Sequence, residues 1–112
     1  MVSVETFRQL ALAFTEAIEQ SHFEKASFRV TKKIFATLDI KNKKAVIKLS
    51  AIDQSVFCSF DKNIIYPVPG KWGFHGWTMI ELKRVRNAML KDALKTSYCT
   101  VAPKSFAEKY QQ

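Results

Sequence analysis

Residues 27–49 alternate apolar and polar side chains, and this stretch constrains the fold more than any other. In SFRVTKKIFATLDIKNKKAVIKL, three apolar runs are separated by lysine-rich breaks at residues 31–33 and 40–44. Side chains two positions apart lie on the same face of a strand. The pattern therefore predicts a three-stranded antiparallel meander with one buried face and a lysine-rich tip at each hairpin.

Helical spacing flanks this meander on both sides. Before it, apolar residues recur every three or four positions and predict an amphipathic helix of four to five turns with Ser3 as its N-cap. Those apolar residues are Phe7, Leu10, Ala11, Phe14, Ala17 and Ile18. After the meander, Ser50 and Asp53 resemble a capping box that begins a short helix. The apolar side of this helix is expected to be Ile52, Val56, Phe57 and Phe60.

Two more strands and a long helix complete the chain. Residues 64–68 and 77–82 read as strands, and two prolines confine the first of them to a sheet edge. Helical spacing returns at Val85, and Pro103 ends that helix before a last helical turn or two. The order is α-βββ-α-ββ-α(α), with no internal repeat or long linker. It predicts an α+β fold in which residues 1–112 form a single compact domain.

The segment PVPGKWGFHGW (residues 67–77) holds all three glycines, both tryptophans and His75. Its glycines are spaced GxxGxxG before a strand, whereas a dinucleotide site needs GxGxxG before a helix. GKWG also matches the GxxG of a KH loop, but its flanks argue against the two helices that such a loop joins. Nothing in the sequence marks a Ser or Cys nucleophile beside His22 or His75, and Cys58 and Cys99 are isolated thiols without metal-ligand spacing. We therefore expect no enzymatic activity, no cofactor and no metal.

The charge of the chain is unevenly distributed. Eighteen Lys and Arg against ten Asp and Glu give +8 overall. Residues 1–22 carry one arginine and three glutamates, which leaves +10 on residues 23–112. Such a surface favours polyanionic partners, and lysines at turns can reach phosphates, although charged turns can also serve solubility alone. The candidate phosphate contacts are Lys32, Lys33, Lys41, Lys43, Lys44 and Lys71.

The two tryptophans carry different expectations. Trp72 lies between Lys71 and Gly73 and is expected to be exposed, where an indole can stack on a base. Trp77 begins a strand that is apolar on both faces, so we expect it in the core. His75 is expected to be a loop histidine partly packed against tryptophan.

The chain as a whole resembles the MmcQ/YjbR family. The resemblance rests on FRVTKKIFATL, on AVIKLS leading into a helix, on YPVPGKWGFHGWTMIEL, and on MLKDALKTSYCTVAPKSFAEKY. It implies a twisted antiparallel sheet flanked by helices in a double-wing arrangement. It also implies the role usually suggested for the family, which is DNA binding. The resemblance implies no catalytic residue and no cofactor.

These observations lead to a ranked set of functional hypotheses. The first is a non-enzymatic DNA-binding module that holds phosphates with its basic hairpin tips and reads few bases. The second is a protein-interaction module that docks a partner through its acidic first helix or through SFAEKYQQ at residues 105–112. The third is an enzyme or a small-ligand binder centred on His75 and Trp72. The longest uncharged run has nine residues, too few to span a bilayer, and no signal peptide is recognised, so a cytoplasmic protein is expected.

Overall fold

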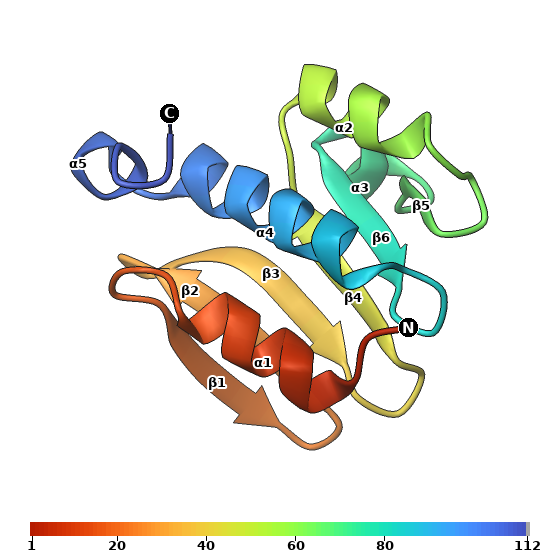
Figure 1. Cartoon of the computed structure of the whole chain (residues 1–112), viewed down its shortest axis with the longest axis horizontal. Coiled ribbons are helices and arrows are strands. Elements are labelled where there is room, and N and C mark those ends of the chain that lie inside the picture. The colour runs from red at the N-terminus through yellow and green to blue at the C-terminus, as the bar shows by residue number, and fades with distance from the viewer. Residues whose placement is uncertain (112) are drawn as a thin grey trace.

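A computed structural model describes residues 1–111 and shows five helices and a six-stranded antiparallel sheet (Figure 1). In chain order the elements are α1 (Val4–Leu12), β1 (Ile18–His22), β2 (Lys25–Val30), β3 (Lys33–Asp39), β4 (Lys44–Lys48), α2 (Ala51–Cys58), β5 (Ile65–Pro67), α3 (Lys71–Phe74), β6 (Trp77–Glu81), α4 (Asn87–Val101) and α5 (Lys104–Ala107). The strands are arranged β1-β2-β3-β4-β6-β5. The expected α+β class is confirmed, and the expected meander is β2-β3-β4.

The first helix is shorter than its periodicity predicts, and the sheet gains a strand there. α1 ends at Leu12, and Ile18 begins β1, which pairs with β2 from Ile18 opposite Arg29 to His22 opposite Lys25. Glu16 has a φ of 60° in the intervening turn. β1 is an edge strand with mostly exposed side chains, so it lacks the apolar alternation that reveals a strand in sequence.

Helices α1 and α4 cover one face of the sheet and enclose the core (Figure 1). Phe7 of α1 meets Phe28 of β2 edge to face, with ring centroids 5.5 Å apart. From α4, Leu90, Leu94 and Tyr98 are fully buried against the strands. Among residues 1–111, no helix crosses the central strands on the opposite face of the sheet, and this uncovered side positions the candidate site.

Ser97 of α4 bridges strands β3 and β4 where their direct hydrogen bonding ends. The β3–β4 ladder ends at the Ala36–Ile47 pair. Beyond it, the Ser97 hydroxyl donates to the Phe35 carbonyl oxygen at 2.7 Å and accepts from the Lys48 amide at 3.1 Å. A helix side chain thus satisfies one buried and one partly buried backbone group that lie beyond the end of the β3–β4 ladder.

Replacing Ser97 with alanine is expected to destabilise the domain by about 1–3 kcal/mol, because it leaves those two backbone groups unsatisfied. Urea unfolding of Ser97→Ala would measure the loss. Thr96→Ala is the matched control, because the Thr96 hydroxyl bonds only within its own helix, to the Asp92 carbonyl oxygen. Equal losses in the two variants would contradict the proposed role of Ser97.

Helix α2 does not bury the side that its sequence indicates. Ser50 caps it as expected, accepting from the Asp53 amide at 3.1 Å. Only Phe57 is buried, however, while Ile52, Val56 and Phe60 are 77%, 52% and 62% exposed. The expectation of a four-residue apolar contact was wrong because α2 packs at the edge strand β5, where the sheet offers little surface to cover a second row.

Candidate nucleic-acid interface

The two lysine-rich hairpin tips lie at opposite ends of the sheet. Thr31 and Lys32 form the β2–β3 turn with positive φ angles of 49° and 71°. The β3–β4 turn, at residues 40–43, lies at the other end of β3, about 20 Å away for a seven-residue strand. Consecutive hairpins of a meander point in opposite directions, so the structure does not gather the candidate lysines into one cluster.

The β3–β4 turn acquires basic neighbours that sequence order does not reveal. Because β4 pairs with β6, the Leu82 amide donates to the Lys43 carbonyl oxygen at 3.0 Å. The run KRVR that follows β6 therefore lies beside this turn. We call the resulting group of exposed cations the basic corner: Lys41, Lys43, Lys83, Arg84 and Arg86. Within residues 1–111, none of the five has a carboxylate oxygen within 4.0 Å.

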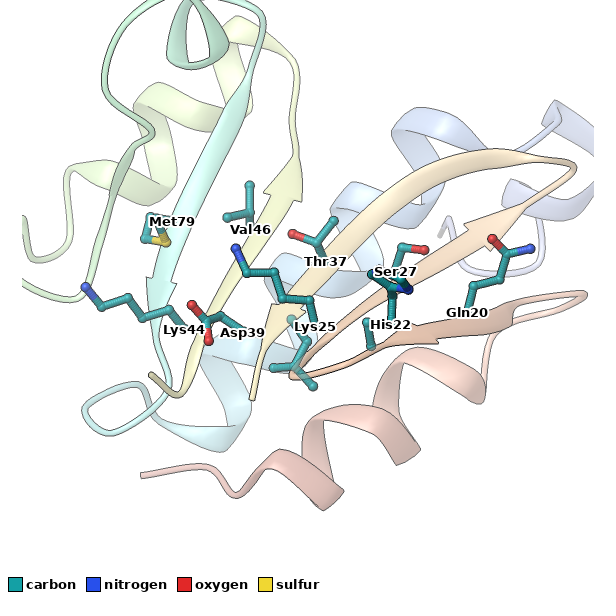
Figure 2. A pocket seen from close by; sticks show the side chains of 11 residues that line it. Gln20, His22, Lys25, Ser27, Thr37, Asp39, Lys44, Val46 and Met79 are labelled. Carbon is teal, nitrogen blue, oxygen red and sulfur yellow. The ribbon is translucent and has the colours of Figure 1, made fainter. Parts of the chain in front are cut away.

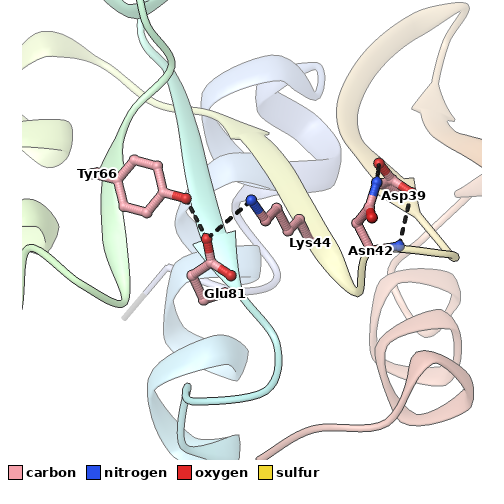
Figure 3. Close-up of polar contacts among 5 residues, drawn as sticks. All are labelled: Asp39, Asn42, Lys44, Tyr66 and Glu81. Atoms are coloured by element: carbon pink, nitrogen blue, oxygen red, sulfur yellow. Dashed lines mark hydrogen bonds and ion pairs between the residues drawn. The ribbon is translucent and has the colours of Figure 1, made fainter.

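Three carboxylates near the basic corner accept hydrogen bonds from other partners, and Figure 3 shows two of them, Asp39 and Glu81. The third, Asp61, lines the same hollow as Arg84 and Arg86 and accepts from the Asn63 amide at 2.8 Å. Glu81 pairs with Lys44 at 3.5 Å and accepts a hydrogen bond from the Tyr66 hydroxyl. Asp39 accepts from the Asn42 amide at 3.1 Å and from its side chain at 2.8 Å, and these bonds lower the pKa of Asp39. Lys44 is thereby partly neutralised, which makes it a weaker phosphate contact than the cations of the corner.

Tyr66 gives this arrangement a signature in the alkaline range. Burial, followed by the hydrogen bond to Glu81 and its charge, raises the pKa of Tyr66 to about 12 from 10. The folded state therefore favours the neutral phenol, so its contribution to stability is intact below pH 10 and is lost as the pH rises through 12. We expect an absorbance titration to show a late-ionising phenol that Tyr66→Phe removes. Loss of a phenol that ionises near the ordinary pKa of 10 in that variant would contradict the raised pKa of Tyr66.

The uncovered side of the sheet, which we call the open face, carries every second residue of each strand. Cross-strand pairs such as Ser27–Thr37 and Val46–Met79 place their side chains there, and Figure 2 shows them with the helices behind the sheet. A hollow of about 360 Å³ lies over these residues and extends to His22 of β1. The row of this face nearest the basic corner alternates in charge, since Lys25, Asp39, Lys44 and Glu81 lie on neighbouring strands.

At its other end the open face is basic and aromatic. Arg29 pairs with Ile34, and Lys48 pairs with Trp77, its ammonium 5.3 Å from the indole centroid. Helix α3 immediately precedes β6 here, so Lys71 and Trp72 lie at the same end of the sheet as Lys32 and Lys33. Four of the predicted contact residues are thus placed at this end, which we call the tryptophan end. Lys41 and Lys43 belong to the other.

The two tryptophans differ from each other in burial. Trp72 is 64% exposed, as expected. Trp77 is half-buried on the open face and is not part of the core, so that expectation was wrong. In β6, Ile80 is the apolar residue that reaches the core, because its side chain points to the opposite face of the strand from Trp77. His75 is exposed at the C-cap of α3.

The first helix and the C-terminal segment, the two surfaces expected to dock a protein partner, both make contacts within the domain. The C-terminal segment packs back on the domain, because the Tyr110 hydroxyl accepts from the Thr15 amide at 2.9 Å and its ring meets Phe14 edge to face. In the first helix, Arg8 pairs with Glu19 of β1 at 2.8 Å. In contrast, no element among residues 1–111 covers the apolar stripe of α2, which consists of Ile52, Val56 and, just after the helix, Phe60.

Chemical groups for a metal site do not converge in the described part of the chain. Residues 1–111 contain no set of three His, Cys, Asp or Glu side chains placed to share a metal ion. Cys58 and Cys99 are both free thiols there, and burial raises the pKa of each. Across these same residues, every helix is too short or too polar to cross a bilayer.

The fold and the site define a small α+β domain with one helix-covered face, one open sheet face and basic residues at both ends. The YjbR family model matches residues 12–100, so this chain belongs to the YjbR family, and the expected resemblance is confirmed. The crystal structure of Deinococcus radiodurans protein DR2400, a DUF419 domain, is similar with a TM-score of 0.79 at 20% identity. The likeness covers 97% of this chain and 88% of that one and supports the shared fold. None of the curated proteins matches the chain.

Proposed function

We propose that this domain is a non-enzymatic DNA-binding module that contacts mainly phosphates and reads few bases. The observation that carries the proposal is the basic corner, where two turns distant in sequence bring five exposed cations together without a carboxylate partner in residues 1–111. Lysine and arginine bind phosphate by releasing condensed counterions, which gives affinity without sequence preference. The tryptophan end supplies further cations along the same sheet.

Salt dependence tests this function directly. With four to six phosphates contacted, the logarithm of the affinity for a labelled duplex should fall with log[salt] at a slope of about −4 to −5. In Lys43→Gln/Arg84→Gln/Arg86→Gln, the slope should become less negative by up to about 3, because each lost contact removes about one counterion. Fluorescence anisotropy at several salt concentrations measures both quantities.

A charge-matched variant separates a local site from a general effect of charge. Lys95→Gln/Lys104→Gln/Lys109→Gln removes the same number of charges, and α5 lies at the far end of α4 from the basic corner (Figure 1). Its slope should stay near that of the wild type. Equal weakening in the two variants would overturn the assignment to the corner, and no binding at low salt would overturn the function. Protein recognition by the exposed stripe of α2 would then be the better-supported role.

A further inference from the structure

A small apolar hollow lies on the open face at the tryptophan end. It encloses about 260 Å³, and we call it the tryptophan slot, lined by Ile34, Thr37, Val46, Val68, Trp72 and Trp77. This volume is below the usual range of about 300–1,000 Å³ for pockets that take a whole small ligand. The slot therefore suits one flat ring system whose remaining atoms stay outside.

The backbone of the segment that carries Trp72 is anchored to neighbouring elements. The Gln54 side-chain amide donates to the carbonyl oxygens of Gly73 at 3.0 Å and Trp77 at 3.3 Å, and so ties α2 to α3 and β6. A tryptophan that is 64% exposed on an anchored segment presents its ring at little further entropic cost. Such an arrangement is favourable for stacking with a partner ring.

Three cations lie around the slot, and no acidic side chain among residues 1–111 lines it. The Lys48 ammonium lies over the Trp77 ring, and Lys71 precedes Trp72 in α3. Arg29 of β2 pairs with Ile34 of β3 at the same end of the sheet. None of these three cations has a carboxylate oxygen within 4.0 Å in residues 1–111. The acidic side chains of the open face, Asp39 and Glu81, belong to the row near the other end.

We propose that the tryptophan slot binds single-stranded DNA, with one base stacked on Trp72 and the adjoining phosphates held by Lys48, Lys71 and Arg29. The inference rests on the proposed function and adds to it a strand type and a base-binding subsite. Bases in a duplex are stacked on their neighbours and cannot enter the slot, whereas an unpaired base can. Aromatic stacking accepts any base, so little sequence preference is expected.

Three DNA probes of equal length test the subsite by fluorescence anisotropy at low salt: a dT 12-mer, a 12-mer of abasic sites and a duplex. Thymidine monophosphate serves as a competitor. Stacking of one base corresponds to about a 5- to 150-fold change in affinity. The dT 12-mer should bind at least about 5-fold more tightly than the abasic strand. Trp72→Ala should remove this advantage and leave the affinity for duplex unchanged.

Two control variants identify the cause of any loss. Phe74→Ala removes an aromatic ring that is 92% exposed in the same short helix but does not line the slot, and it should bind dT as the wild type does. Trp72→Phe keeps an aromatic face and should retain most of the affinity. Thermal melting verifies that each variant is folded.

The outcomes separate this inference from the proposed function. The subsite is overturned if Trp72→Ala binds the dT 12-mer as the wild type does, if the abasic strand binds equally well, or if thymidine monophosphate binds as tightly as the 12-mer. In those cases duplex binding that responds to the basic-corner variants would leave the proposed function standing. Absence of binding to every strand would overturn both.

Discussion

Replacing Gly76 with alanine is expected to lower the free energy of unfolding by about 4 kcal/mol or more, the largest effect of any substitution considered. Gly76 has a φ of +96°, and a Cβ atom there would lie 1.9 Å from the Leu49 carbonyl oxygen. That contact is with backbone, and the Leu49 amide also donates to the Gly76 carbonyl oxygen at 2.9 Å. The backbone segments at Leu49 and Gly76 cannot move apart to remove the clash without breaking this hydrogen bond.

Gly70 provides the matched control for this prediction. Its φ of +81° also disfavours a side chain, but no atom lies within 4 Å of the position that a Cβ would take. Gly70→Ala should therefore show backbone strain alone, about 1–3 kcal/mol. Urea unfolding of both variants measures the difference, and equal losses would show that close approach to Leu49 is unimportant. Because Gly76 immediately precedes Trp77, a variant that does fold should also have an altered tryptophan slot.

Replacing Tyr98 with alanine is expected to destabilise the domain by about 3–5 kcal/mol, as for other large buried aromatic residues. Tyr98 is fully buried, stacks on Phe14 with centroids 4.7 Å apart, and meets Phe35 and Tyr110 edge to face. These rings join the turn after α1, the sheet and the C-terminal segment. Removing the central ring would leave a cavity that elements from three parts of the chain cannot readily fill.

Tyr98→Phe separates the ring from its hydroxyl. The hydroxyl donates to the Thr15 carbonyl oxygen at 2.5 Å, so its removal should cost about 0.5–1.5 kcal/mol. Calorimetric or chemical unfolding of Tyr98→Ala and Tyr98→Phe compares the two losses of stability. If the phenylalanine variant were as unstable as the alanine variant, the hydrogen bond rather than packing would be the main contribution of this residue.

Local signals in the sequence predicted much of this fold. Ser3 and Ser50 cap their helices as expected, each accepting from the amide three residues later. The alternation in residues 27–49 predicted three strands in their observed order. Caps and alternation depend on neighbours within a few residues, so sequence reveals them. Strand β1 was not predicted, because its exposed edge position imposes no apolar pattern.

The candidate site depended on contacts that sequence does not display. Lysine content indicated a basic surface, but the gathering of Lys43 with Arg84 and Arg86 follows from the pairing of β4 with β6 across an intervening helix and strand. The same topology sends Lys32 to the opposite end. The exposure of Trp72 could be inferred from its polar and glycine neighbours, while the presence of Trp77 on the open face required the register of β6.

The sequence by itself determined the α+β class, most of the elements, the helix caps and the positive charge, because each follows from the composition or spacing of nearby residues. Only the tertiary structure decided which cations share a surface and which face of the sheet stays uncovered. The physical reason is that strand order and register are fixed by hydrogen bonds and core packing between residues far apart in the chain. These long-range contacts set the direction of every surface side chain without leaving a local pattern.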